Sequence, residues 1–218
     1  MSRDLPQGME TVKPLAHSKT IGVAQHGTRF AVQSRRGNVA VAEANMIVEE
    51  KLKALRLHLP DLDEQYRKNA SGARFISHYA VQNVLYLSGT TPVKDGQPFN
   101  TGVLGQDLTL QQGYEAARYA TLTSLAAVKY ALGDLDRVQQ IVQLIGFVNS
   151  APGFGDQPRV INGATDLLVE LYGDRGKPTR AAIGCQGLAI NHSVEIVMTV
   201  LFSGSDVRAP LARDQCAG

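Results

Sequence analysis

The chain has 218 residues, 44% of them hydrophobic and 19% charged, and a formal net charge of +2. These values are typical of one globular domain with extensions, and the net charge is too small to indicate nucleic-acid binding. No apolar run approaches the ~20 residues that a membrane-spanning helix requires. The two cysteines, Cys185 and Cys216, have no metal-ligand spacing. We therefore expect a cytoplasmic protein with no metal, nucleic-acid or membrane partner.

The two ends of the chain differ from its middle. Residues 1–45 include several basic residues but no Asp or Glu between Thr11 and Ala42, which predicts a poorly ordered N-terminal extension. An organelle transit peptide is the alternative interpretation of the same pattern. Residues 204–218 lack periodicity and are predicted to form a disordered tail. The regular part, 46–203, is the candidate domain.

The first part of this domain is predicted to hold a leading helix and short strands. Apolar residues recur at helical spacing before Pro60, at Val48, Leu52, Leu55 and Leu59. A polar stretch, 60–73, follows. Residues 74–93 favour two short strands that turn near Gln82–Asn83, and Asp95–Gly96 is typical of a tight turn.

The clearest helix is predicted over 109–132. Thr109 and Gln112 have the spacing of a capping box, and Gly133 supplies a C-terminal stop. One face of this helix is apolar, with Leu110, Tyr114, Ala117, Leu125, Val128 and Leu132 along it. Such a face is expected to pack on a sheet.

The second part of the domain alternates strands with a helix. Residues 139–150 are nearly continuous β-branched and apolar sequence, as expected of an interior strand. A second amphipathic helix is predicted over 157–172, ending at Gly173. Strands over 179–186 and 193–202 close the domain.

The predicted order is a leading helix followed by β-β-(β)-α-β-α-β-β. One mixed sheet with two helices on one face is a two-layer α+β fold. No further predicted helix within the core is available to cover the other face of the sheet. We therefore expect an oligomer in which subunits cover one another's sheets.

Each of the last two predicted strands carries one charge within apolar sequence, Arg180 in the first and Glu195 in the second. If these strands form a hairpin, its loop falls near Gly187–Leu188 and the two charges lie nearly opposite one another. One interpretation is a cross-strand ion pair, worth ~0.2–1 kcal/mol when exposed. The other is a site in which the arginine binds a carboxylate and the glutamate activates a water molecule.

Several segments together resemble the Rid family, the reactive intermediate deaminases that are also called YjgF-like. They are "LYLSGTTPV", "GQDLTLQQGYEAARYATLTSLAAVKYALGDLDRV", "VNSAPGF" followed by "VINGATDLLVELYG", and "PTRAAIGCQGLAINHSVEI", the last with the pattern P-x-R-x-A-x(12)-E. The leading helix and "NGATDL" resemble a longer branch of the family. The resemblance implies a chorismate-mutase-like fold and a homotrimer with sites at the clefts between subunits. It also implies cofactor-free hydrolysis of enamines or imines of small 2-keto acids, with release of ammonia.

The resemblance assigns roles to three residues. Arg180 matches the family arginine that holds the substrate carboxylate, and Glu195 matches the glutamate associated with the hydrolytic water. Ser88 matches the serine of the "SG" strand end that lines the pocket. We take Arg180 and Glu195 as the catalytic candidates.

Three further positions are candidates for substrate binding. Phe75 stands where the family has a pocket tyrosine, so a hydroxyl is lost, and Ala182 stands where the family has a cysteine. Both departures bear on the choice of substrate more than on the fold. Asn149 follows the predicted buried strand and either lines the cleft or caps a turn.

These observations leave three hypotheses about function. The first is a cofactor-free imine or enamine deaminase, which Arg180 and Glu195 favour. The second is a trimer that binds a small carboxylate without turnover, which the thinner polar lining at Phe75 and Ala182 favours. The third is RNA cleavage, against which the near-neutral charge argues.

Overall fold

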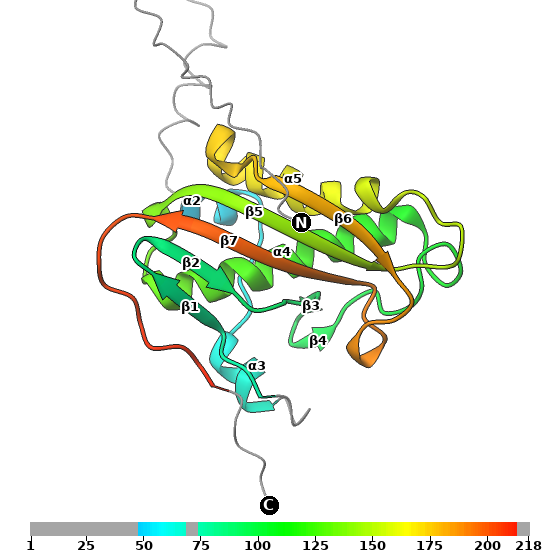
Figure 1. Cartoon of the computed structure of the whole chain (residues 1–218), viewed down its shortest axis with the longest axis horizontal. Helices are drawn as coiled ribbons and strands as arrows, with labels where there is room; N and C mark the ends of the chain where they lie inside the picture. Colours follow the sequence, from blue (N-terminus) through cyan, green and yellow to red (C-terminus); the bar gives the residue numbers. More distant parts are fainter. Residues whose placement is uncertain (1–47, 69–73, 213–218) are drawn as a thin grey trace, which may run out of the picture. The chain divides into compact units, whose positions relative to one another are not determined.

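The computed structural model of the chain describes residues 48–68 and 74–212 (Figure 1). The extension predicted over 1–45 lies outside the described residues. No helix in the described ranges is long and apolar enough to cross a membrane.

A five-stranded mixed sheet forms one layer of the fold, with the strand order β1-β2-β7-β5-β6. All neighbouring strands run antiparallel except β5 and β6, which are parallel. The strands are β1 (His78–Val81), β2 (Val84–Leu87), β5 (Val138–Asn149), β6 (Thr179–Cys185) and β7 (Val194–Phe202). The predicted turn at Gln82–Asn83 joins β1 to β2, with Gln82 at a φ of 53°.

The prediction that the last two strands form a hairpin is wrong. β6 pairs with β5 alone, and β7 lies on the other side of β5. The reason is α5 (Gln157–Tyr172), which connects β5 to β6. A strand that returns through a helix pairs in parallel with the strand that precedes the helix.

Two helices form the second layer and lie behind the sheet in Figure 1. They are α4 (Leu110–Leu132) and α5. The predicted capping box of α4 is present between Thr109 and Gln112, and Gly133 ends the helix at a φ of 78°. Leu85, Leu144 and Met198 are among the buried sheet residues packed into the core with the helices. The predicted two-layer α+β arrangement is confirmed.

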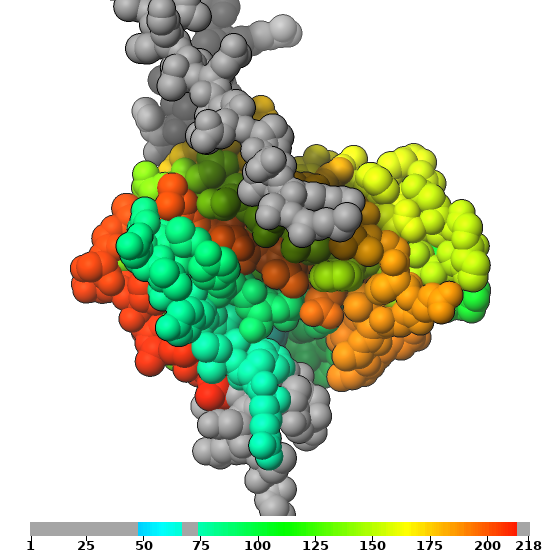
Figure 2. Space-filling view, viewed as in Figure 1, coloured from blue at the N-terminus to red at the C-terminus, as the bar shows by residue number. Residues whose placement is uncertain are grey.

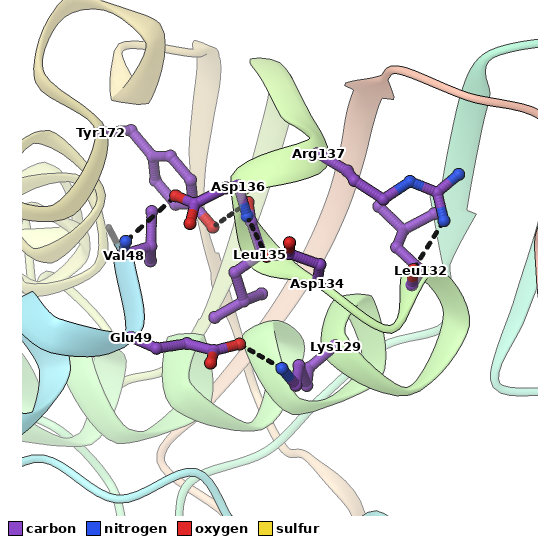
Figure 3. A network of polar contacts seen from close by, with 9 residues as sticks. All are labelled: Val48, Glu49, Lys129, Leu132, Asp134, Leu135, Asp136, Arg137 and Tyr172. Atoms are coloured by element: carbon purple, nitrogen blue, oxygen red, sulfur yellow. Dashed lines mark hydrogen bonds and ion pairs between the residues drawn. The ribbon is translucent and has the colours of Figure 1, made fainter. Parts of the chain in front are cut away.

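The leading segment is docked on the core by polar contacts (Figure 3). The helix α2 (Val48–Ala54) begins where the backbone N–H of Val48 donates to Asp136 Oδ1, at 3.0 Å. Glu49 forms an ion pair with Lys129 of α4. The sequence did not predict a second short helix, α3 (Leu62–Lys68), within the polar stretch 60–73. It begins at Asp61, whose Oδ1 accepts from the backbone N–H of Glu64.

The predicted disordered tail is corrected over 204–212. The carbonyl of Arg208 lies 2.9 Å from His78 Nε2, and the Arg208 guanidinium lies over the ring of Tyr130. The backbone N–H of Ser77 donates to the carbonyl of Leu211. This part of the tail lies along β1 and α4. It is held there because it provides hydrogen-bond acceptors for Ser77 and His78 and a cation for the ring of Tyr130.

A small hairpin projects from the domain between β2 and α4. Its strands are β3 (Val93–Lys94) and β4 (Gln97–Pro98). Asp95 and Gly96 join them with φ values of 51° and 74°, as expected of a two-residue turn of this composition.

Figure 2 views the molecule from the side of the sheet that faces away from the helices. This face carries exposed apolar side chains in the single chain. Tyr79 and Tyr86, paired on β1 and β2, are 62% and 50% exposed, and Ile183 on β6 is 43% exposed. Exposed aromatic and β-branched side chains on one sheet face are typical of a protein-protein contact surface.

Candidate functional site

One half of the candidate site lies where β2 ends beside β7. Thr90 and Ile196 exchange both backbone hydrogen bonds, at 2.9 Å each, and so hold the segment after β2 against β7. The carboxylate of Glu195 lies against Gly89. A Cβ atom placed on Gly89 would come within 1.9 Å of Glu195 Oε1. The glycine therefore leaves the space that the carboxylate occupies.

Glu195 sits in surroundings that favour a base. Its side chain is half-buried and faces away from the helices, because Val194 and Ile196 on either side are fully buried. The carboxylate has no hydrogen-bond or ion-pair partner among the described residues. Burial raises the pKa of Glu195 above its ordinary value. A carboxylate of raised pKa accepts a proton from water more readily.

Ser88 and Phe75 lie near the same strand end. The hydroxyl of Ser88 donates to the carbonyl of Ile76 at 2.5 Å, which fixes its orientation. The ring of Phe75 packs edge-on against Tyr66 of α3, with ring centroids 6.2 Å apart. The aromatic position therefore contacts the leading segment.

The other half of the candidate site is Arg180 on the edge strand β6. Its Nη1 donates to Asn162 Oδ1 at 2.8 Å and to Thr165 Oγ1 at 3.2 Å, both on α5. Nε and Nη2 have no partner within the described parts of the chain. These two nitrogens form the planar fork that binds a carboxylate in bidentate fashion.

Ala182 and Asn149 both contact other parts of the chain, whereas two nitrogen atoms of Arg180 have no partner in the described ranges. Ala182 is half-buried and packs on the core. Asn149 is 2% exposed, and its Nδ2 lies 3.3 Å from each of three acceptors, among them Asn191 Oδ1 and the carbonyl of His192. In the single chain Asn149 holds the loop between β6 and β7.

The two halves do not meet within one chain. Arg180 pairs with Leu144 of β5 and Glu195 pairs with Phe147 of the same strand. Leu144 and Phe147 are three residues apart in a regular part of β5, so their side chains lie on opposite faces of the sheet. The expected cross-strand arrangement of Arg180 and Glu195 is therefore wrong, because β5 lies between their strands.

Sequence reasoning missed three residues that shape these half-sites. Asn162 and Thr165 hold the Arg180 guanidinium, and Gly89 makes room for the Glu195 carboxylate. The signal for the first two was present: polar residues at i and i+3 flank the apolar face of α5 and belong to the "NGATDL" segment. The role of Gly89 had no signal beyond the "SG" strand end.

No group of three or more His, Cys, Asp or Glu side chains in the described ranges is arranged to hold a metal ion. The chemistry that these half-sites offer is that of a guanidinium fork and a half-buried carboxylate. The chain is therefore a two-layer α+β domain with an oriented guanidinium on its edge strand β6 and a half-buried carboxylate on β7.

The chain belongs to the family described as "YjgF/chorismate mutase-like, putative endoribonuclease", whose model matches residues 49–202. It is 34% identical to a protein of unknown function from Agrobacterium tumefaciens, whose structure it matches with a TM-score of 0.65 over 75% of this chain and 97% of that one. A structure described as a putative endoribonuclease, from Shewanella oneidensis, is 30% identical, with a TM-score of 0.67 over 72% of this chain and 100% of that one.

A curated relative is protein TCP17 of Trypanosoma cruzi. It is 38% identical over 128 residues, which are 58% of this chain and 80% of TCP17. The resemblance to the YjgF-like family that the sequence motifs indicated is therefore confirmed.

Proposed function

We propose that the protein hydrolyses an enamine or imine of a small 2-keto acid, without a cofactor, in a homotrimer whose sites lie between subunits. One observation carries the proposal: a half-buried carboxylate of raised pKa, Glu195, lies beside a strand end and has no partner among the residues that the structure describes. A charge left unpaired at such a position costs stability, so a functional reason for it is needed. We keep the cytoplasm as the proposed location, since nothing in the sequence calls for a disulfide.

Arg180 would bind the substrate carboxylate. Asn162 and Thr165 occupy Nη1, which leaves the Nε and Nη2 fork pointing to a substrate. A guanidinium that is already oriented loses less side-chain entropy on binding than a free one. Holding the carboxylate also fixes the position of the neighbouring imine carbon.

Glu195 would activate the water molecule. Acting on the protonated imine, it accepts one proton from water while the water oxygen bonds to the imine carbon, which yields a neutral carbinolamine. Glu195 then returns this proton to the amino nitrogen, the carbon–nitrogen bond breaks as the hydroxyl oxygen forms the carbonyl, and the hydroxyl proton leaves with ammonia as ammonium, which gives the keto acid. Both roles require only positioning and electrostatics.

The separation of the two half-sites supports the proposed assembly. A substrate that contacts both a carboxylate and a guanidinium would receive them from different copies of the chain. The uncovered sheet face, with Tyr79 and Tyr86, offers a surface for such contacts. A closed ring of three copies is the arrangement that the family resemblance implies.

The test is release of ammonia and keto acid from enzymatically generated 2-aminoacrylate and 2-iminobutyrate. We expect acceleration by the wild type and a drop of about a hundredfold in Arg180→Ala, since about two hydrogen bonds to a charged group are lost. Arg159→Ala is the matched control, because Arg159 is an exposed α5 arginine paired with Asp156. Acceleration equal in Arg180→Ala and wild type would contradict the proposal.

A binding protein without turnover is the alternative, favoured by Phe75 at the position of the family tyrosine. It predicts that 2-oxobutyrate binds to the wild type, that Arg180→Ala abolishes binding, and that neither imine is hydrolysed faster. Titration of the keto acid alongside the activity assay therefore decides between the two functions.

A further inference from the structure

A cavity of about 870 Å³ is lined by residues other than those that form the two half-sites. It is enclosed by the connection between α2 and α3, by the β3–β4 hairpin, by the outer side of α4, and by the loop that precedes β7. This volume is in the range of small-molecule sites. Neither Arg180 nor Glu195 lines it.

The walls of the cavity are largely apolar. Leu57, Leu59 and Val93 contribute to them, with the ring of Tyr119 from α4. At the rim stands Ile190, which is 67% exposed and has a φ of 55°. A β-branched residue in the left-handed region is rare, and here the loop presents an apolar side chain to water. An apolar ligand body would cover it.

Two buried nitrogen atoms among the lining residues have no hydrogen-bond partner in the described parts of the chain. They are Nε2 of Gln65 and Nδ1 of His192. His192 is only 5% exposed. Buried polar groups without partners are uncommon and costly. An oxygen acceptor brought by a ligand would satisfy the Gln65 amide, and His192 could donate to it in the matching tautomer.

Positive charge stands at the same cavity. The ammonium of Lys94 lies 5.2 Å from the ring centroid of Phe99 and 5.4 Å from that of Tyr119, and no carboxylate pairs with it in the described ranges. Arg56 also lines the cavity without an acidic partner among those residues. The lining carboxylates are Asp61, which already accepts from the backbone N–H of Glu64, Glu64 itself, and Asp95 in the turn of the β3–β4 hairpin. Lys94, Arg56 and the two nitrogen atoms described above are the groups that a carboxylate ligand would face.

We propose that this cavity is a second binding site, which takes a small amphipathic carboxylic acid. The apolar or aromatic body of the ligand lies between the α2–α3 connection and α4, and its carboxylate faces Lys94 and the unpaired nitrogens. The site is built by the leading segment, so it is a property of chains that carry that segment.

The test compares naphthaleneacetate with naphthaleneacetamide by isothermal titration calorimetry on the full chain. The two probes share a body and differ in charge. We expect the acid to bind about tenfold more tightly than the amide, the value of one charge-assisted hydrogen bond. Lys94→Met removes this difference, and Val93→Trp, which fills the cavity, abolishes binding of both probes.

Two controls keep the result specific. Lys53→Met removes an exposed lysine of α2 that does not line the cavity, and Arg180→Ala removes the guanidinium of the proposed catalytic site. Both variants are expected to bind the acid as the wild type does. Absence of binding at millimolar concentration, equal affinity for acid and amide, or loss of binding in Arg180→Ala would each overturn the proposal. Lys94→Met alone decides the matter if Val93→Trp does not fold.

Discussion

Glu195 and Arg180 illustrate how the fold sets the chemistry of single residues. Glu195 is half-buried, has no partner in the described ranges, and has a pKa that burial raises. Arg180, in contrast, is exposed and is held by two side chains of α5. Burial destabilises the charged form of the Glu195 carboxylate. The two neutral side chains of α5 orient the Arg180 guanidinium but leave its charge available. Each state suits the role proposed for that residue.

Glu195→Gln is expected to lower kcat by at least about a hundredfold, the usual effect of losing a general base. In the wild type kcat/KM should fall at low pH as the carboxylate is protonated, with an apparent pKa above the ordinary 4.5. The pKa is higher in the folded than in the unfolded chain, so stability falls as pH rises between these values. Urea unfolding should therefore find Glu195→Gln more stable than wild type at pH 7 and equal to it below pH 4.5. A variant less stable at neutral pH would contradict this account.

Asn162→Ala and Thr165→Val are expected to raise KM by about three- to tenfold with little change in kcat. Each removes an acceptor from the charged Arg180. A hydrogen bond to a charged group contributes about 1.5–3 kcal/mol, but these bonds are exposed, so we expect about 0.7–1.4 kcal/mol, which corresponds to this change of KM. Steady-state kinetics with 2-iminobutyrate measures the effect. Asp166→Ala is the control, since Asp166 lies on the same helix but accepts from Tyr114. An equal rise of KM in the control would assign the effect to the helix instead of the guanidinium.

Among the elements, those with strong local signals were predictable from sequence. The helix α4 has a capping box, an apolar face and a glycine stop, and its observed range is Leu110–Leu132. The strand β5 was recognised because its interior position demands apolar residues on both faces. The helix α3 was missed because seven residues with an acidic first turn leave no visible apolar face.

Strand pairing was less predictable than strand existence. Hydrophobic periodicity locates β6 and β7 in the sequence but does not show which strands they pair with. A hairpin was predicted because only a short loop connects the two strands. The β5–α5–β6 order was the decisive signal, because a helical crossover implies parallel neighbours. The candidate residues themselves came from the family resemblance, and Asn162 and Thr165 were missed because their partner Arg180 is remote in sequence.

The helices α4 and α5 cross closely at Gly163. A Cβ atom added there would lie 2.0 Å from the backbone carbonyl oxygen of Tyr114, which cannot move aside like a side chain. Gly163→Ala is therefore expected to lower the free energy of unfolding by about 2 kcal/mol or more, as overpacking does. Urea denaturation compares it with Gly155→Ala, where an added Cβ meets no neighbouring atom within 4 Å. Equal stability of the two variants would show that the helices separate without cost.

At the scale of the whole molecule, the uncovered sheet face and the divided site point to one assembly. The exposed Tyr79, Tyr86 and Ile183 lie on the face to which Glu195 also points. Arg180 lies at the sheet edge on the other side. A second subunit packed on the open face would bring its strand β6, with Arg180, close to Glu195 of the first subunit. Within a single chain these two residues cannot meet.

Mixing two inactive variants tests this assembly directly. In a ring of three subunits, a cleft is functional only if one neighbour supplies Glu195 and the other supplies Arg180. The Arg180→Ala and Glu195→Gln variants are mixed in equal amounts, unfolded and refolded together. The mixture should recover about a quarter of wild-type activity, because about one cleft in four then contains both intact residues. Each variant refolded alone is the control. Light scattering should report a trimer for the mixture, and a Tyr86→Glu variant of both chains should abolish trimer and activity together. A mixture that forms trimers but stays inactive would mean that each site is built from one chain, against the separation of Arg180 and Glu195 by β5.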